Sequence, residues 1–219
     1  MRMRKKQWAQ PELNDCPFFR KDAAAHQGDW RKEFFRPEAP LCLELGCGKG
    51  GFLSQMGLAH PEQNFIGIDL ISNMLGVARR RIVADYEAAG REVENLLIFS
   101  WDISRIKEIF PEEKNISAIY INFCNPWPKA GHHKRRLTHP RQLEQYKALL
   151  SPDGKIVFKT DDSPLFEASV EYFREAGFRI EYLTRNLGES DFPDSPATEH
   201  QLMFEAEGIP TKLLVARPE

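Results

Sequence analysis

Short apolar runs alternate with segments of helical character along the chain, which is the pattern of an α/β protein. The nearly continuous apolar run from Leu41 to Leu45 is typical of a strand covered on both faces of a parallel sheet. Seven strands are predicted, at 41–45, 65–69, 96–100, 116–123, 155–160, 178–184 and 212–216. Helices are predicted at 52–59, 73–89, 142–150 and 164–176, with another starting at 104. The sequence therefore predicts a mostly parallel sheet with helices packed on it.

Particular residues support two of these helices. In the 73–89 segment, Leu75, Ala78, Ile82 and Tyr86 share one face, and Gly90 follows as a helix-ending glycine. The turn at 151–154 leads into the strand at 155–160, and Ser163 precedes the helix that starts at Pro164, where it can act as a cap.

A glycine-rich turn follows the first strand. Gly46, Gly48 and Gly51 fit both the G-x-G-x-x-G fingerprint of dinucleotide-binding proteins and the looser glycine turn of S-adenosylmethionine (SAM) methyltransferases. Glu44 favours SAM, because a carboxylate there attracts the cationic amino acid end of SAM and repels a pyrophosphate. An NAD-dependent dehydrogenase is the weakest alternative, and a glycine turn that binds no ligand remains possible.

Two further acids follow the next two predicted strands. Asp69 lies about twenty residues after the glycines, where a nucleotide-binding β-α-β unit places its ribose-binding carboxylate. Asp102 is placed to accept from an adenine amino group while Ile103 packs on the ring. The alternative for Asp102 is a cap on the helix from Ser104. Three acids after three consecutive strands are less easily dismissed than any one of them.

Composition narrows the class of protein. At 219 residues and 42% hydrophobic content the chain suits one sizeable core, and a net charge of −2 gives no global sign of a nucleic-acid binder. The four cysteines form no C-x-x-C pair, so neither a zinc site nor another metal site nor a disulfide framework is expected. No apolar run is long enough to span a bilayer, and no signal peptide is evident. A cytoplasmic protein is expected.

Residues 1–40 read as an arm in front of a domain at 41–219. The arm has a basic tip, Arg2, Arg4, Lys5 and Lys6, followed by an irregular stretch rich in aromatic residues and proline. It could pack on the domain or remain a solvated tail, and the sequence favours neither.

A rigid loop and a basic segment follow the fourth predicted strand. Pro126 and Pro128 flank a tryptophan and fix the backbone directly after Asn125, at the carboxyl end of a strand, where catalytic groups of α/β proteins gather. The segment from Lys129 to Arg141 has five Lys or Arg, three His and no acid. Phosphate is its natural partner, although a merely solvated basic loop would look the same.

Taken together, these residues resemble the bacterial tRNA (guanine-N7-)-methyltransferase family, the TrmB type. The most specific part of the resemblance is Asn125-Pro126-Trp127-Pro128-Lys129 followed by His133-Lys134-Arg135-Arg136-Leu137, supported by the 43–48 segment, Thr160-Asp161 and Thr198-Glu199. The resemblance implies a seven-stranded class I methyltransferase fold, Rossmann-like, with helices on both faces. It also implies transfer of a methyl group from SAM to N7 of guanine 46 in the tRNA variable loop, by a monomer or homodimer.

The resemblance and the basic segment together give a set of expected site residues. The expected contacts of SAM are Glu44, Gly46, Gly48, Asp69, Asp102, Ile103 and Asn125. The expected contacts of tRNA are Lys129, Arg135, Arg136, Asp161, Thr198, Glu199, His200 and Gln201, and the expected catalytic pair is Asn125 and Asp161.

Two positions depart from the family pattern. Asn125 stands where the family usually has an aspartate, and Gln201 stands where it usually has a glutamate. Guanine N7 carries an in-plane lone pair and needs no base, so alignment and a negative environment are what the protein must supply. Asp161 and Glu199 are then the expected sources of negative charge.

Two other functions remain open at this point. An Asn-Pro-aromatic order resembles the loop of methyltransferases that act on exocyclic amino groups, although the tryptophan here falls one place early. A non-catalytic RNA-binding module that retains the SAM fold would also be compatible with Asn125 in place of aspartate.

Overall fold

The computed structural model describes residues 6–26, 30–110, 114–192 and 196–219. The chain divides into two units, Met1–Ile109 (unit 1) and Phe110–Glu219 (unit 2), and each is described by itself. Four strands belong to each unit, so the described residues form eight strands where seven are predicted. The α/β class with mostly parallel strands is confirmed.

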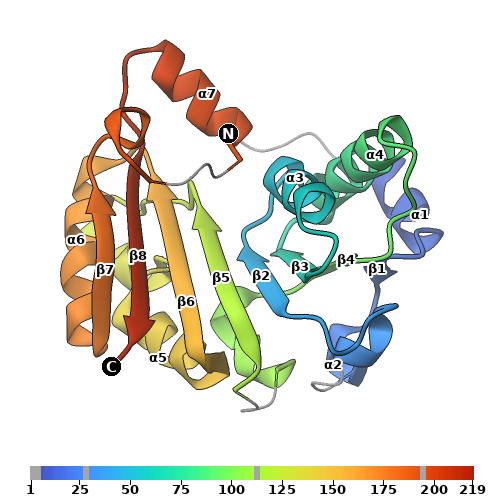
Figure 1. The fold of residues 1–219 in the computed structure, drawn as a ribbon, viewed down its shortest axis with the longest axis horizontal. Coiled ribbons are helices and arrows are strands. Elements are labelled where there is room, and N and C mark those ends of the chain that lie inside the picture. Colours follow the sequence, from blue (N-terminus) through green and yellow to red (C-terminus); the bar gives the residue numbers. More distant parts are fainter. Residues whose placement is uncertain (1–5, 27–29, 111–113, 193–195) are drawn as a thin grey trace. The chain divides into compact units, whose positions relative to one another are not determined.

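Unit 1 contains four parallel strands in the order β1-β4-β3-β2 (Figure 1). Its strands are β1 (Phe19–Arg20), β2 (Leu41–Leu45), β3 (Asn64–Asp69) and β4 (Leu96–Ser100). Its helices are α1 (Ala9–Asn14), α2 (Ala23–His26), η1 (Trp30–Glu33), α3 (Gly51–Ala59), α4 (Ser72–Ala88) and η2 (Ile103–Glu108). β1 is the strand that the sequence did not predict, because a two-residue edge strand leaves no periodic pattern.

In unit 2 the strand order is β5-β6-β8-β7, and β8 runs antiparallel to both of its neighbours. Its strands are β5 (Ile116–Asn122), β6 (Leu150–Thr160), β7 (Phe178–Thr184) and β8 (Lys212–Pro218). Its helices are η3 (Ala130–Arg135), α5 (Pro140–Leu149), α6 (Ser163–Glu175), η4 (Leu187–Glu189) and α7 (Glu199–Ala206). The predicted turn at 151–154 falls inside β6, where the register against β5 shifts between Ile116 and Ala118.

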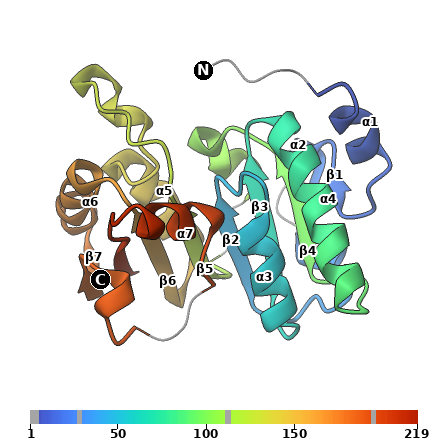
Figure 2. The ribbon, with the colours of Figure 1, turned by 90° about the horizontal axis from the view of Figure 1, so that it is seen from above.

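Helix α4 shows how the apolar pattern becomes packing. Figure 2 shows α3 and α4 side by side over the strands of unit 1. The predicted face of Leu75, Ala78, Ile82 and Tyr86 is fully buried, and Gly90 follows the helix with a left-handed φ of 64°. Both predictions are confirmed.

The N-terminal residues pack on unit 1. Ala9 and Leu13 of α1 are buried, and α1 lies against α4. Trp30 stacks on Phe99 of β4 with ring centroids 4.5 Å apart and donates its indole N–H to the carbonyl of Ile109 at 2.7 Å. Residues 6–26 and 30–40 therefore belong to a segment that packs on unit 1 rather than to a solvated tail. Arg2, Arg4 and Lys5 of the basic tip lie outside the described residues.

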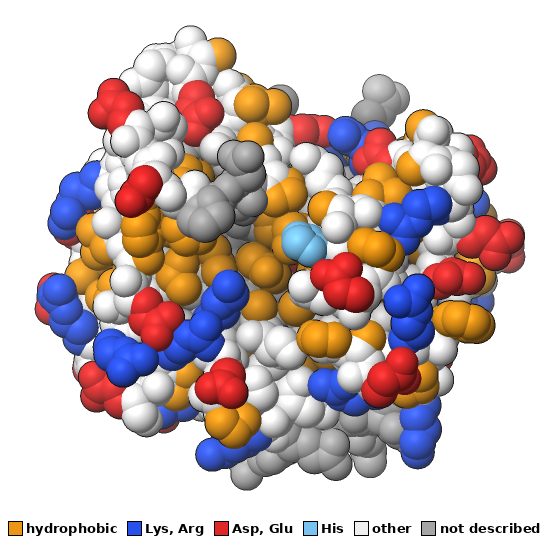
Figure 3. Space-filling model, viewed as in Figure 1, with side chains coloured by type: hydrophobic (Ala, Val, Ile, Leu, Met, Phe, Trp, Pro, Cys, Tyr) orange, Lys and Arg blue, Asp and Glu red, His pale blue; other side chains and the backbone are white. Residues whose placement is uncertain are grey.

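Unit 2 buries one face of its sheet under α5 and α6. On the other face, shown in Figure 3, hydrophobic side chains gather over the strands. They form a cluster of Val157, Leu213 and Val215 with the partly buried Tyr120, Tyr182, Leu187 and Phe192. Among the helices that the structure describes, none has both the length and the hydrophobicity needed to cross a bilayer.

We expect Gly76→Ala to separate α1 from α4. An added Cβ would lie 2.5 Å from the Cβ and 3.0 Å from the Cα of Ala9, so backbone would have to move. Overpacking of this kind costs about 1–3 kcal/mol, against a gain of about 1 kcal/mol in helix propensity. Urea denaturation should show a lower free energy of unfolding.

Gly131→Ala is the control, because an added Cβ there meets nothing within 4 Å. A Gly76→Ala variant more stable than the parent, as propensity alone would give, would contradict the tight packing of α1 on α4.

Candidate functional site

The glycine turn between β2 and α3 is tied to the end of β3. Gly46, Gly48 and Gly50 have φ values of 81°, 51° and 73°, which side chains with a Cβ rarely adopt. The N–H groups of Gly46 and Cys47 donate to the carbonyl of Ile68 at 2.8 and 3.1 Å. The turn is thereby fixed at the carboxyl edge of the unit 1 sheet.

The Asp69 side chain also links the glycine turn to the end of β3. One oxygen of its carboxylate accepts from the N–H of Gly48 at 3.0 Å, and the other accepts from the N–H of Ile71 at 2.8 Å. Burial nevertheless raises the pKa of the Asp69 carboxyl, against the opposing effect of its backbone hydrogen bonds. The carboxylate is both a structural bridge and an acceptor at the rim of the turn.

The electrostatic character of the turn is negative. Glu44 is buried at 4% exposure at the end of β2. The pKa of the Cys47 thiol is raised well above its usual range by burial, and the charges of Glu44 and Asp69 raise it further. Asp69 suits the ribose of either cofactor, so Glu44 is the acid that favours a cationic group over a pyrophosphate at this turn.

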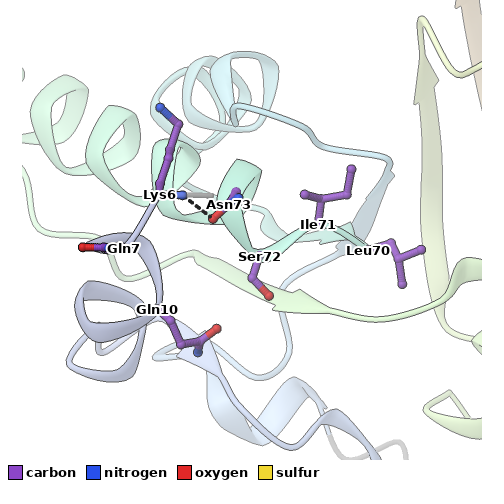
Figure 4. A pocket seen from close by; sticks show the side chains of 7 residues that line it. All are labelled: Lys6, Gln7, Gln10, Leu70, Ile71, Ser72 and Asn73. Atoms are coloured by element: carbon purple, nitrogen blue, oxygen red, sulfur yellow. Dashed lines mark hydrogen bonds between the residues drawn. The ribbon is translucent and has the colours of Figure 1, made fainter. Parts of the chain in front are cut away.

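A hollow of about 630 Å³ lies directly after Asp69 in unit 1 (Figure 4). Leu70 and Ile71 extend from the loop between β3 and α4 and are 64% and 47% exposed. The backbone N–H of Lys6 donates to the side-chain oxygen of Asn73 at 3.2 Å on another side of this hollow. Two apolar side chains, Leu70 and Ile71, and five polar residues line the hollow: Lys6, Gln7, Gln10, Ser72 and Asn73.

Asp102 and Ile103 follow β4. The Asp102 carboxylate accepts from the N–H of Ser104 at 2.9 Å and caps η2, so the capping alternative holds for one of its oxygens. Asp102 is exposed and Ile103 is buried. The exposed carboxylate remains available to a ligand.

In unit 2, the loop after β5 has a constrained backbone. Phe123 and Trp127 have φ values of 50° and 42°, in the left-handed region that costs a non-glycine residue about 1–3 kcal/mol. The Asn125 side-chain oxygen accepts from the N–H of Trp127 at 3.0 Å and closes the loop between the two positions. Backbone strain of this kind is typical of functional sites.

Arg136 supports the same loop and corrects one prediction. Its Nε donates to the carbonyl of Pro126 at 2.8 Å, and its guanidinium lies 3.5 Å from the hydroxyl of Tyr172 on α6. Arg136 is only 4% exposed, so it cannot lie on the surface as the basic segment predicts. We therefore withdraw Arg136 as a phosphate contact.

The other cations of the basic segment are at the surface. Lys129, Lys134 and Arg135 are exposed. The guanidinium of Arg135 lies over the ring of Trp127 at 5.1 Å from its centroid, a cation–π contact that places Arg135 beside the loop.

A hollow of about 380 Å³ lies at the carboxyl ends of β5 and β6. The residues that line it come from the loop after β5, the segment after β6, and α7: Phe123, Cys124, Asn125, Pro126, Asp161, Asp162, His200 and Phe204. It unites Asn125, Asp161 and His200 of the predicted site. The sequence did not single out Phe123 and Phe204, because their role depends on the placement of α7.

The two adjacent aspartates of this hollow differ. Asp162 accepts from the N–H of Leu165 at 2.7 Å and caps α6. Asp161 is held through its backbone, whose carbonyl accepts from Nζ of Lys212 at 2.9 Å. Among the described residues, no hydrogen bond or ion pair engages the Asp161 carboxylate. It is therefore ready to accept from a ligand.

Cys124 is the remaining reactive group of this hollow. Burial raises the pKa of its thiol to about 12. The thiol is therefore neutral and a poor nucleophile. Within the part of the chain that the structure describes, no group of three or more His, Cys, Asp or Glu could hold a metal ion.

The Thr198–Gln201 segment begins helix α7. The hydroxyl of Thr198 accepts from the N–H of Gln201 at 3.0 Å, and the Gln201 amide donates to Glu205 at 3.1 Å. Thr198 and Gln201 are buried, whereas Glu199 and His200 are exposed. Thr-x-x-Gln is the sequence pattern of a capping box, and Thr198 makes the first of its two hydrogen bonds. This pattern could have predicted the start of α7.

Comparison with known proteins identifies the class of this fold and then the family. Residues 38–212 match a family model described as "Putative methyltransferase". The solved structures of the aminoglycoside resistance methyltransferase NpmB1 and of precorrin-6y C5,15-methyltransferase from Geobacter metallireducens share the fold, each with a TM-score of 0.55. Their identities are 16% and 12%, over 82% and 99% of this chain and 87% and 90% of theirs. The protein is a methyltransferase with the class I fold.

Curated relatives are much closer in sequence. The chain is 52% identical to a tRNA (guanine-N(7)-)-methyltransferase of Clostridium beijerinckii over 99% of this chain and 98% of the relative. It is 50% identical to the same enzyme of Clostridium botulinum over the full length of both chains, and 48% identical to that of Ruminiclostridium cellulolyticum over 99% and 92%. The chain belongs to the tRNA (guanine-N7-)-methyltransferase family, and the predicted resemblance is confirmed.

We expect Arg136→Ala to destabilise the protein by about 2–3 kcal/mol, because it leaves the Pro126 carbonyl without its charged donor. Arg135→Ala is the matched control: Arg135 is exposed, and its loss should change the free energy of unfolding by less than about 1 kcal/mol. Chemical denaturation of both variants measures the difference. Equal effects of the two substitutions would show that Arg136 does not hold the loop.

Proposed function

We propose that this protein transfers the methyl group of SAM to N7 of guanine 46 in the variable loop of tRNA. The observation that carries this proposal is the Asp161 carboxylate, which lies in the unit 2 hollow without a protein partner among the described residues. A guanine presents two adjacent donors, N1–H and the exocyclic amino group, and a carboxylate accepts both. The names of the full-length relatives support the same base and the same atom.

The residues of unit 1 fit SAM. Glu44 would attract its amino acid end, the Gly46 and Gly48 turn would let it approach the backbone, and Asp69 would accept from the ribose hydroxyls. Asp102 would accept from the adenine amino group beside Ile103. When bound, SAM supplies an electrophilic methyl group on a sulfonium.

In unit 2, the residues would orient the base. Asn125 keeps the loop in shape through the N–H of Trp127, a role that needs an oxygen but no charge. Asp161 would hold the edge of the guanine and provide the negative charge that Asn125 lacks, with Glu199 exposed at the start of α7. N7 uses its own lone pair, so no residue has to remove a proton before transfer.

The tRNA backbone would lie along the exposed cations of the basic segment. Lys129, Lys134 and Arg135 present three positive charges beside the loop. Contacts of this kind give affinity without sequence specificity and depend strongly on salt.

The test is methyl transfer from labelled SAM to unmodified tRNA, followed by nuclease digestion and identification of the labelled nucleoside. The proposal requires labelled 7-methylguanosine, and loss of the label when the tRNA carries adenine in place of guanine 46. A labelled N6-methyladenosine or N2-methylguanosine would identify an enzyme for exocyclic amino groups. Binding of tRNA without any transfer would identify a non-catalytic RNA-binding module.

We expect Asp161→Ala to lower kcat by a factor on the order of a hundred, as for removal of one group that stabilises a developing charge. Asn125→Asp should leave kcat similar or higher, because aspartate keeps the oxygen that accepts from Trp127. Asp153→Ala is the control, because Asp153 is an exposed aspartate in the 151–154 segment of β6 and does not line the hollow. A parent without turnover that Asn125→Asp activates would mean that the chain has lost its catalytic acid.

A further inference from the structure

Three aromatic residues from distant parts of unit 2 line the hollow that Asp161 also lines. Phe123 lies after β5, and His200 and Phe204 lie on successive turns of α7. The ring centroids are 5.9 Å apart for Phe123 and His200, 6.2 Å for Phe123 and Phe204, and 6.3 Å for His200 and Phe204. The ring planes differ by 22°, 22° and 31°. We refer to Phe123, His200 and Phe204 as the aromatic wall.

The spacing of the wall decides how a base can meet it. A base between two rings needs about 7 Å between them, twice a van der Waals contact. The centroids are closer than that for every pair. A base can therefore lie against the wall but not between two of its rings.

The wall lies where it could interact with the positive charge that methyl transfer places on the guanine. As N7 forms its bond to the methyl carbon, the S–C bond breaks and its electron pair remains on sulfur, so the positive charge of the sulfonium moves to the five-membered ring of guanine. No proton is transferred. The faces of aromatic rings carry negative electrostatic potential and attract a cation, most strongly where water is excluded.

We propose that the aromatic wall binds the target guanine by stacking, with Phe204 and His200 as substrate-contacting residues, and that the phenyl rings of Phe123 and Phe204 stabilise the positive charge that develops on the base. This inference rests on the proposed function. It assigns to ring faces a share of the charge stabilisation that the neutral side chain of Asn125 cannot give. Asp161 would act at the edge of the base while the wall acts at its face.

Helix α7 offers matched controls. Leu202 and Met203 lie on the same helix, are 59% and 47% exposed, and do not line the hollow. Phe204→Leu keeps an apolar side chain and removes the ring, whereas Leu202→Ala removes a similar side chain outside the wall. We expect Phe204→Leu to lower kcat between about twofold and thirtyfold, the range of one cation–π contact, and Leu202→Ala to leave it unchanged.

Fluorination of the ring at position 204 distinguishes stabilisation of charge from packing against the base. Phenylalanine with one, two or three ring fluorines, incorporated at position 204 alone, keeps the shape of the ring and withdraws electrons from its face. We expect kcat for methylation of unmodified tRNA to fall with each fluorine, while SAM affinity and thermal stability stay at the parental values. A KM for tRNA that changes less than kcat is expected, because the charge exists only during transfer.

The outcomes distinguish this inference from the function on which it rests. If the parent forms no 7-methylguanosine, the proposed function fails. If the parent forms it and the fluorinated variants keep parental kcat while Phe204→Leu loses activity, the wall only packs the base and the charge role is overturned. If Phe204→Leu also keeps parental kcat and KM, the wall does not contact the base at all.

Discussion

The two hydrogen bonds at the Asp69 carboxylate are the constraint on which the glycine turn of unit 1 depends. The carboxylate accepts from the N–H of Gly48 in the glycine turn and from the N–H of Ile71 at the start of α4, so one side chain fixes two backbone segments. Burial makes the charged form less favourable, which the raised pKa of Asp69 records. A ligand that donates hydroxyl groups to this carboxylate would therefore stabilise its charged form.

In unit 2, other side chains fix the backbone of a loop at the end of a strand. The loop after β5 has two non-glycine residues at positive φ, Phe123 and Trp127, and two hydrogen bonds hold it in that shape, with a surface cation–π contact beside them. Asn125 accepts inside the loop, Arg136 donates to the Pro126 carbonyl, and Arg135 lies over Trp127. Asparagine satisfies the structural part of this arrangement as well as aspartate would. Under the proposed function, the negative charge would come from Asp161, because guanine N7 reacts through its own lone pair.

Local patterns predict much of this structure and miss what depends on tertiary contacts. Apolar runs predict strands β2 to β6 and β8, because covered strands need buried positions, whereas β7 is partly exposed. The acids at the ends of the parallel strands follow from parallel geometry. β1 is too short to leave a pattern. A charge run cannot reveal that Arg136 turns inward while Arg135 stays exposed. The wall was missed because Phe123 and Phe204 are 81 positions apart and meet only through α7.

The central claim is that guanine N7 attacks through its own lone pair, so that the protein aligns the base and complements its charge without removing a proton. The most direct measurement is the single-turnover rate of methyl transfer to unmodified tRNA between about pH 7.5 and pH 8.5, where an ordinary imidazole stays neutral, at saturating SAM and tRNA. The account predicts a rate that does not vary with pH over this range. A rate that rises tenfold per pH unit would show that a proton must leave before transfer, and would contradict N7 as the acceptor.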